Sequence, residues 1–221
     1  MKINQFAIAT VATLLIGSSL VAQQTPANST SQASSNTPQQ AANSLTKDQT
    51  FAQCLAIADQ EQVTLCRFAQ GKATKDEVKQ LAATLEKAHQ GCLEQLKGIS
   101  SQIGSPGNAT TTSAKTPVNN SASVDFLQLH QEISTQCLKD SQEYLSNKKG
   151  AEFDECFVGM QIAKHAGMHS TLTVLQRQAT GKLQGLIKDA LETNKEHMEA
   201  AVNLMEQLAA DKSAKLSQSS K

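Results

Sequence analysis

Apolar residues at three- and four-residue spacing, in five separate segments, constrain the fold of this chain more than any other feature. Such spacing places apolar side chains on one face of an α-helix. No segment alternates apolar and polar residues as a half-buried strand does. The pattern therefore predicts an all-α fold in which consecutive helices form antiparallel hairpins. The expected helices cover about 47–70, 74–96, 124–145, 152–178 and 182–210.

Local signals mark the ends of several of these helices. Thr46 is a candidate N-cap of the first helix, and Gly71 is its expected end. Thr74 and Glu77 have the spacing of a capping box at the start of the second helix. Gly181 is expected to separate the fourth helix from the fifth. In the third helix, the residues expected to face the core are Phe126, Ile133, Cys137 and Tyr144.

The N-terminus has the pattern of an export signal. Lys2 precedes an apolar run from Phe6 to Val21 that contains no acidic residue, and cleavage is expected after Ala22. An uncleaved N-terminal anchor is the alternative. The sequence thus predicts an exported protein, periplasmic or extracellular.

Low-complexity segments divide the rest of the chain. Segments rich in Ser, Thr, Asn, Gln and Pro bury too little apolar surface to offset their chain entropy. We expect a signal peptide at residues 1–22 and a disordered leader at 23–45. A first helical hairpin at 46–99 is followed by a flexible loop at 100–123. The remaining helices of the same bundle cover 124–211, and a disordered tail covers 212–221.

Charge and composition narrow the classes of function. The chain has 20 basic and 20 acidic residues, and aromatic residues make up only 3%. Without a basic face or aromatic stacking residues, nucleic-acid binding is not expected. The sequence also lacks the phosphate-binding loop, the dinucleotide fingerprint and the nucleophile elbow of common enzyme classes. The partner remains unknown, with an envelope protein or a membrane surface as the candidate classes.

The five cysteines can be placed by the symmetry of the hairpins. Residues equidistant from a tight turn lie at the same height on two antiparallel helices. Cys54 and Cys92 are equidistant from residue 73, and Cys137 and Cys156 are equidistant from the turn at 146–147. In an oxidising compartment this predicts the disulfides Cys54–Cys92 and Cys137–Cys156, with Cys66 left as an inert buried thiol. The alternative is that all five are reduced core residues.

Four of the five histidines follow the apolar faces of the expected helices: His89, His130 and His197 lie inside an apolar stripe, and His165 lies at the edge of one. Hairpin symmetry puts His130, His165 and His197 at one level of the bundle. His169 follows His165 by four residues, a spacing that presents two imidazoles on one helix face. His89 lies inside the apolar stripe of its own helix.

Two interpretations of these histidines stay open. Imidazole nitrogens are good ligands for a transition metal such as zinc, copper or iron. Alternatively, the histidines are hydrogen-bonded core residues. An ordinary di-iron centre is not expected, because it needs a Glu-x-x-His motif on two helices and only Glu86 precedes a histidine of this set in that way.

Three stretches of the sequence resemble the exported bacterial ferritin-like proteins grouped as domain of unknown function 4142. They are DQTFAQCLAIADQEQVTLCRFAQGKATKDEVKQLAATLEKAH, FDECFVGMQIAKH and KEHMEAAVNLMEQL, within residues 48–208. The resemblance implies a ferritin-like four-helix bundle with an additional helix, and no established activity. The three histidines that recur in the family match His89, His165 and His197.

The chain departs from this family at potential ligands. Gln62 stands where a glutamate is usual, Ala88 where an aspartate is usual, and Phe157 where a tyrosine is common. The sequence therefore favours a non-enzymatic envelope protein acting in binding or stress protection. The alternatives are a metal-binding or redox bundle that uses the histidines, and an amphipathic module that binds a protein or a lipid surface.

Overall fold

The computed structural model describes residues 45–100 and 125–219, and every regular element in these ranges is an α-helix. The all-α prediction is therefore confirmed. The helices are α1 (Lys47–Gln70), α2 (Asp76–Lys97), α3 (Phe126–Ser146), α4 (Ala151–Gln178) and α5 (Gly181–Ser219). The expected signal peptide, nearly all of the expected leader and nearly all of the expected flexible loop lie outside the described residues.

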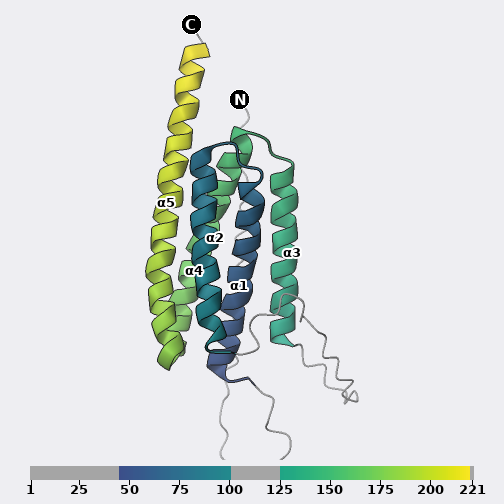
Figure 1. Ribbon diagram of the computed structural model, residues 1–221, viewed down its shortest axis with the longest axis vertical. Helices are drawn as coiled ribbons and strands as arrows, with labels where there is room; N and C mark the ends of the chain where they lie inside the picture. Colours follow the sequence, from purple (N-terminus) through teal and green to yellow (C-terminus); the bar gives the residue numbers. More distant parts are fainter. Residues whose placement is uncertain (1–44, 101–124, 220–221) are drawn as a thin grey trace, which may run out of the picture. The chain divides into compact units, whose positions relative to one another are not determined.

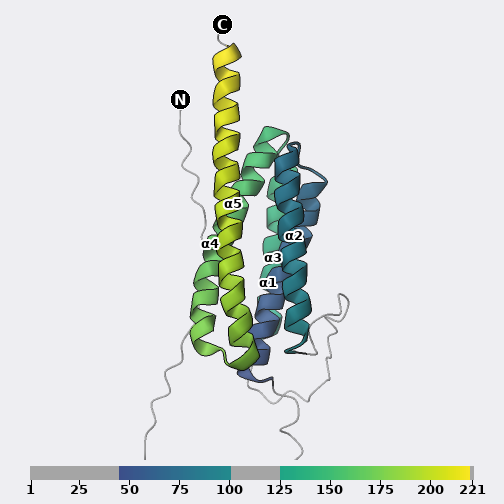
Figure 2. The same cartoon turned by 60° about the vertical axis from the view of Figure 1, so that its left-hand side comes forward.

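Two antiparallel hairpins form the body of the helical bundle. One consists of α1 and α2, the other of α4 and α5, and α2 also packs against α5 (Figures 1 and 2). The remaining helix, α3, packs mainly against α1 and only weakly against α4. The architecture is thus a four-helix bundle of α1, α2, α4 and α5 with α3 as an additional helix at its side.

Local signals set the ends of α1 and the start of α5. The Thr46 hydroxyl accepts a hydrogen bond from the Gln49 backbone N–H at 3.2 Å, and the Gln49 side chain accepts one from the Thr46 N–H at 2.9 Å. This capping box satisfies two N–H groups that the helix itself leaves unpaired. Gly71 is the C-cap, as predicted. Gly181 begins α5 with a φ of 50°, a conformation that favours glycine.

The predicted capping box at the start of α2 is wrong, because a carboxylate from another helix takes its place. The Thr74 hydroxyl donates to Asp154 Oδ2 at 2.6 Å instead of accepting from Glu77. Asp154 also accepts from the backbone N–H groups of Thr74 and Lys75, both at 3.0 Å. A charged acceptor forms stronger hydrogen bonds than a neutral hydroxyl, so the buried Asp154 of α4 caps α2 across the bundle.

The core consists of two apolar clusters separated by a polar layer. One cluster lies near the α1–α2 turn and includes Leu65, Leu85 and Phe157, while the other lies toward the opposite end and includes Leu172 and Ile187. Between them, each of the four bundle helices contributes a polar side chain to the interior. We call this set the polar layer: Gln62, His89, Gln161, His165, Asn194 and His197. Because buried polar groups need partners, this polar layer is the region of the core in which we look for a functional site.

The predicted core face of α3 is largely exposed. Phe126, Ile133 and Tyr144 are 50%, 47% and 42% exposed, and only Ser134 and Leu145 of this helix are buried. The periodicity correctly predicts an amphipathic helix. It does not predict that the four other helices already enclose the core, which leaves α3 to cover only part of α1.

The predicted disordered tail is also wrong for residues 212–219, since α5 continues to Ser219 and extends beyond the other helices (Figure 1). No glycine or proline interrupts this segment, and Ala and Lys favour helix. Ion pairs also hold its beginning, from Lys75 to Asp211 and from Lys212 to Glu155.

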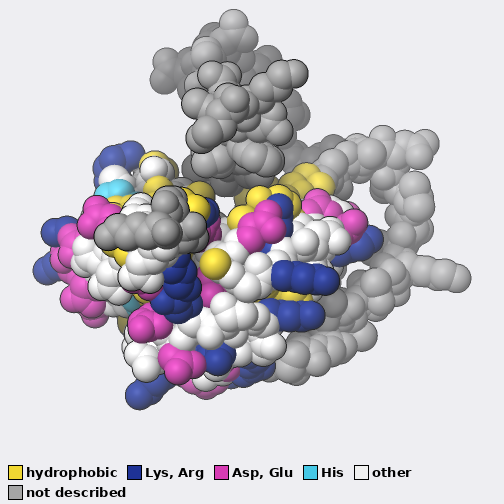
Figure 3. Space-filling model, turned by 90° about the horizontal axis from the view of Figure 1, so that it is seen from above, with side chains coloured by type: hydrophobic (Ala, Val, Ile, Leu, Met, Phe, Trp, Pro, Cys, Tyr) yellow, Lys and Arg dark blue, Asp and Glu magenta, His cyan; other side chains and the backbone are white. Residues whose placement is uncertain are grey.

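Charges of both signs are interspersed over the described face in Figure 3. None of the helices within residues 45–100 and 125–219 combines the length and the hydropathy of a membrane span.

Candidate metal centre

Three histidines from three helices converge in the polar layer. His89 comes from α2, His165 from α4 and His197 from α5. One ring nitrogen of each lies within 4.8 Å of the corresponding nitrogens of the other two. The ring centroids are 5.7 Å apart for His89 and His165, 5.8 Å for His89 and His197, and 5.3 Å for His165 and His197. We call these three residues the histidine triad.

Two members of the triad, His165 and His197, are held in the neutral state. His165 and His197 are only 2% and 8% exposed. Burial lowers the pKa of each to about 4, and the neighbouring histidines contribute in the same direction. Both imidazoles are therefore uncharged at neutral pH. A neutral imidazole has the free lone pair that a metal ion requires.

Oxygen atoms in contact with Nδ1 orient two of the three rings. His89 Nδ1 lies 2.7 Å from a carboxylate oxygen of Asp59, on α1. His165 Nδ1 lies 2.8 Å from the backbone oxygen of Gln161, one turn earlier on α4. A carboxylate or carbonyl on one ring nitrogen fixes the tautomer in which the other nitrogen carries the lone pair. In both residues Nε2 is thus the available ligand atom.

The Nε2 atoms of His89 and His165 are buried and have no hydrogen-bond partner in the structure. Buried polar atoms are nearly always hydrogen-bonded, so two unpaired nitrogens in one cluster need an explanation. The interpretation of these residues as satisfied core histidines does not supply one. A metal ion bound to both Nε2 atoms would supply one.

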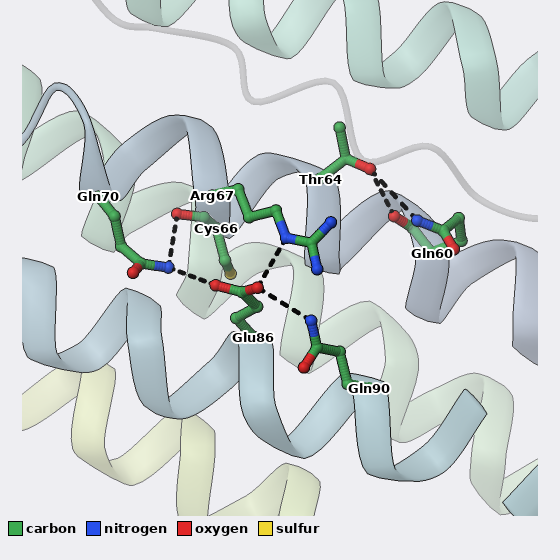
Figure 4. Close-up of polar contacts among 7 residues, drawn as sticks. All are labelled: Gln60, Thr64, Cys66, Arg67, Gln70, Glu86 and Gln90. Carbon is green, nitrogen blue, oxygen red and sulfur yellow. Dashed lines mark hydrogen bonds and ion pairs between the residues drawn. The ribbon is translucent and has the colours of Figure 1, made fainter. Parts of the chain in front are cut away.

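The Glu86 carboxylate, outside the triad, connects the part of α2 that carries His89 to α1. Glu86 lies one turn before His89 and accepts hydrogen bonds from Arg67 Nε at 2.7 Å and from Gln70 Nε2 at 2.6 Å, both on α1 (Figure 4). It also accepts from Gln90 Nε2 at 2.9 Å. These donors lower the pKa of the Glu86 carboxyl. Glu86 therefore joins the two helices of the first hairpin one turn away from His89, and its carboxylate is engaged outside the triad.

A cavity adjoins the triad on one side. It has a volume of about 60 Å³ and lies between α2 and α5, with α1 and α4 contributing to its inner wall. His89, His197 and Asp59 line its polar part, and Asn194 of its lining donates to the His165 backbone oxygen at 2.9 Å. Aliphatic side chains line most of the remainder. We call this space the α2–α5 cavity; it gives the triad a path toward solvent.

The structure brings together three of the five histidines singled out in the sequence. His165 and His197 meet, as hairpin symmetry about Gly181 predicts. His130 does not join them: it is partly exposed on α3 and stacks on Phe126, with ring centroids 6.1 Å apart. His169 is exposed on α4. His89 completes the triad in place of His130, as the resemblance described in the sequence analysis implies.

The two predicted disulfides are not present, since all five cysteines are free thiols. In the second hairpin, Cys156 Sγ contacts the Tyr144 hydroxyl at 3.6 Å, whereas Cys137 lies two helical turns further from the loop. The turn spans residues 147–150 and is longer than the symmetry argument assumed. The height predicted for Cys156 was therefore wrong.

In the first hairpin, the symmetry argument places Cys54 and Cys92 at approximately the right height along the bundle. It does not give the face of α1 on which Cys54 lies. Cys92 lines the α2–α5 cavity, and α1 contributes Leu55 and Asp59 to this lining but not Cys54, the neighbour of Leu55. One residue turns the side chain by about 100° around a helix. Burial raises the pKa of Cys54 to about 11 and that of Cys66 to about 12, so both stay protonated thiols. Cys66 is fully buried, as expected.

Sequence reasoning missed two residues of the site, Asp59 and Gln161. Asp59 was detectable, because Asp59 and His89 are equidistant from residue 74, inside the first turn. Gln161 is fully buried, and both polar atoms of its side chain lack a hydrogen-bond partner. No sequence signal distinguishes it from the exposed glutamines of the chain.

Comparison with known proteins identifies the family but no relative of known activity. The family model described as Domain of unknown function (DUF4142) matches residues 31–208. The chain therefore belongs to this family, and the match spans the helices that supply the triad. No curated protein and no solved structure matches the chain.

Proposed function

We propose that this member of the DUF4142 family is a transition-metal-binding helical bundle whose ligands are His89, His165 and His197. The observation that carries the proposal is the pairing pattern of the imidazoles. In His89 and His165, Nδ1 has an acceptor partner, while Nε2 is buried, unpaired and directed into a cluster of three ring nitrogens. Metal-binding histidines have this arrangement.

The distances in the triad suit a metal after small side-chain rotations. With metal–nitrogen bonds of about 2.0–2.1 Å, two nitrogens of a tetrahedral site are about 3.3 Å apart. The three nitrogens, now within 4.8 Å of one another, would have to approach by an ångström or so. Three imidazoles without a thiolate favour a divalent ion such as zinc or copper, with iron as a weaker candidate.

The electrostatics of the site also favour a divalent cation. The neutral imidazoles of His165 and His197 carry no proton that a metal must displace at neutral pH. Asp59 supplies one carboxylate directly behind His89. Burial raises the pKa of this carboxyl, and a bound cation would offset that penalty by stabilising its charge.

We also propose that the bundle is ferritin-like and exported, and that it acts by holding metal in the cell envelope. Support for export comes from the sequence alone, from the apolar run Phe6–Val21. Binding or sequestering a transition metal is a form of the binding or stress-protection role that the composition favours. Fractionation of cells that express the chain with and without residues 2–22 tests export.

Metal binding is tested by titrating the chelator-treated protein with cobalt(II), which replaces zinc in nitrogen sites and reports its geometry by its absorption. We expect one equivalent to bind with the spectrum of a four-coordinate site. Replacing His165 with Ala should weaken binding by more than the roughly 10–100-fold that loss of an outer-shell partner costs. Elemental analysis of the protein purified without chelator or affinity tag identifies the native metal.

The matched control is His130→Ala, which removes a histidine outside the triad and should leave cobalt binding unchanged. Helix content by circular dichroism separates a loss of ligand from a loss of fold. If His165→Ala does not fold, His165→Gln keeps a polar side chain of similar size without the imidazole. A wild-type protein that binds neither cobalt, zinc, copper nor iron would overturn the proposal.

A further inference from the structure

The triad supplies three ligands and leaves room for a fourth. Among the described residues, no further histidine, cysteine or carboxylate has a ligand atom inside the cluster. The nearby Asp59 is engaged with the far side of His89. Zinc sites with three protein ligands keep a position for water or substrate, whereas closed structural sites have four. An exogenous molecule would therefore complete the coordination.

The α2–α5 cavity is the space from which such a molecule can approach. Two triad members, His89 and His197, lie in its wall. Further from the triad the wall is aliphatic and includes Leu96, Leu172 and Ile187. Toward the surface, the lining residue Gln95 is exposed and Ala190 is partly exposed, which places the mouth between α2 and α5.

Its size limits the occupant to very few atoms. A cavity needs about 10–15 Å³ on this measure to hold one water molecule. The volume of about 60 Å³ thus corresponds to roughly four to six such positions along the whole space. A nucleotide, a sugar or an amino acid does not fit, whereas a diatomic molecule does.

Its polarity favours a neutral occupant. No lysine or arginine lines the cavity, and its one carboxylate, Asp59, repels anions. The aliphatic part of its wall resembles the apolar cavities that bind small apolar molecules such as xenon. A charged ligand would lose its hydration in the aliphatic part without gaining a partner there.

We propose that the α2–α5 cavity admits a small neutral molecule of the size of dioxygen and holds it beside the fourth coordination position of the triad metal. This inference rests on the proposed function, because it assigns the ligand class of the same centre. The aliphatic wall supplies the affinity for the molecule, and the triad side supplies the position at which it meets the metal.

Xenon and dioxygen test the cavity directly in the metal-free protein. With methyl groups of Leu and Ile labelled, we expect saturable xenon-induced shifts at Leu96, Leu172 and Ile187. Dioxygen should enhance the relaxation of the same methyl groups. Ala190→Leu places a larger side chain in the cavity wall and should reduce both responses at least ten-fold. Ala200→Leu, on the exposed face of the same helix, is the matched control and should leave them unchanged.

Cobalt titration of the same three proteins separates this inference from the proposed function. Both leucine variants should bind cobalt like the wild type, because neither replaces a ligand. Normal cobalt binding without a xenon or dioxygen response would overturn the cavity inference alone. A xenon response without cobalt binding in the wild type would overturn the proposed function, and with it the role of the cavity beside a metal.

Discussion

The four-helix bundle and α3 carry similar apolar patterns but differ in what covers them. In the bundle, the apolar faces of all four helices pack around a shared core, and His165 at the edge of an apolar stripe becomes 2% exposed. On α3, Phe126 and Ile133 occupy the centre of the stripe and remain about half exposed. His130 accordingly stacks on Phe126 at the surface. An amphipathic face creates a buried site only where enough neighbours enclose it.

Two helix-capping aspartates should show the largest difference in stability between the bundle and α3. Asp154 caps α2 from α4 in the bundle and accepts three hydrogen bonds while fully buried. Asp125 caps its own helix, α3, by accepting from the Leu127 and Gln128 N–H groups at an exposed position. We expect Asp154→Ala to lower the free energy of unfolding by about 3 kcal/mol, since it removes the shared acceptor of three hydrogen bonds, each worth about 1 kcal/mol. Asp125→Ala should cost only about 1 kcal/mol.

Urea unfolding of the two variants, followed by circular dichroism, measures both costs. Asp154→Asn is an intermediate case, because the amide keeps one acceptor oxygen but loses the charge. Its free energy of unfolding should lie between those of Asp154→Ala and the wild type. Equal losses for Asp154→Ala and Asp125→Ala would show that the cap across the bundle is no stronger than a local one.

The pH dependence of stability sharpens the contrast between the two histidine environments. The pKa of His165 falls from 6.5 to about 4 on folding because burial disfavours the imidazolium. Between these values the unfolded chain binds more protons than the folded one, so stability is lost as the pH falls from about 6.5 to 4. For His165 alone this loss amounts to about 3 kcal/mol.

Urea unfolding of the metal-free protein between pH 7 and 4.5 measures this dependence. His165→Gln removes the titrating group, so its profile should be flatter than that of the wild type. His130→Gln changes a partly exposed histidine and should reproduce the wild-type slope. If His165→Gln retains the full slope, groups other than this buried imidazole account for the acid sensitivity.

Sequence periodicity and helix signals were sufficient for the helices and for part of the site. Thr46 and Gly71 cap the two ends of α1 as predicted, because helix caps are local interactions. Symmetry about Gly181 paired His165 with His197, because a short turn fixes the relative height of two helices. It could not place His89, since the long segment between α2 and α3 hides the height of the first hairpin relative to the second.

What the sequence could not provide is the rotation of each helix and the set of helices that enclose the core. Cys54 has roughly the height of Cys92 but not the face, and no disulfide forms. His130 has a core-like position in its own helix, yet α3 lies outside the four-helix bundle. Both errors arise because local patterns specify a face relative to its own helix and not relative to the neighbouring helices.

The smallest expected effect concerns Asp59, which contacts the triad member His89 from behind and is not itself a proposed ligand. Asp59 orients His89 through a 2.7 Å contact to Nδ1 and contributes a negative charge next to the triad. Asp59→Asn keeps the size of the side chain but loses the charge and can reverse the hydrogen bond. We expect cobalt affinity to fall roughly 10–100-fold, which is about 1.4–2.8 kcal/mol.

The control is Glu61→Gln, which replaces a carboxylate that pairs with Lys164 and Ser134 between α1, α3 and α4. It should leave cobalt affinity unchanged, because Glu61 supports the packing of α3 and not the triad. A comparable fall in both variants would mean that the metal senses the total charge of the bundle and not the Asp59–His89 contact.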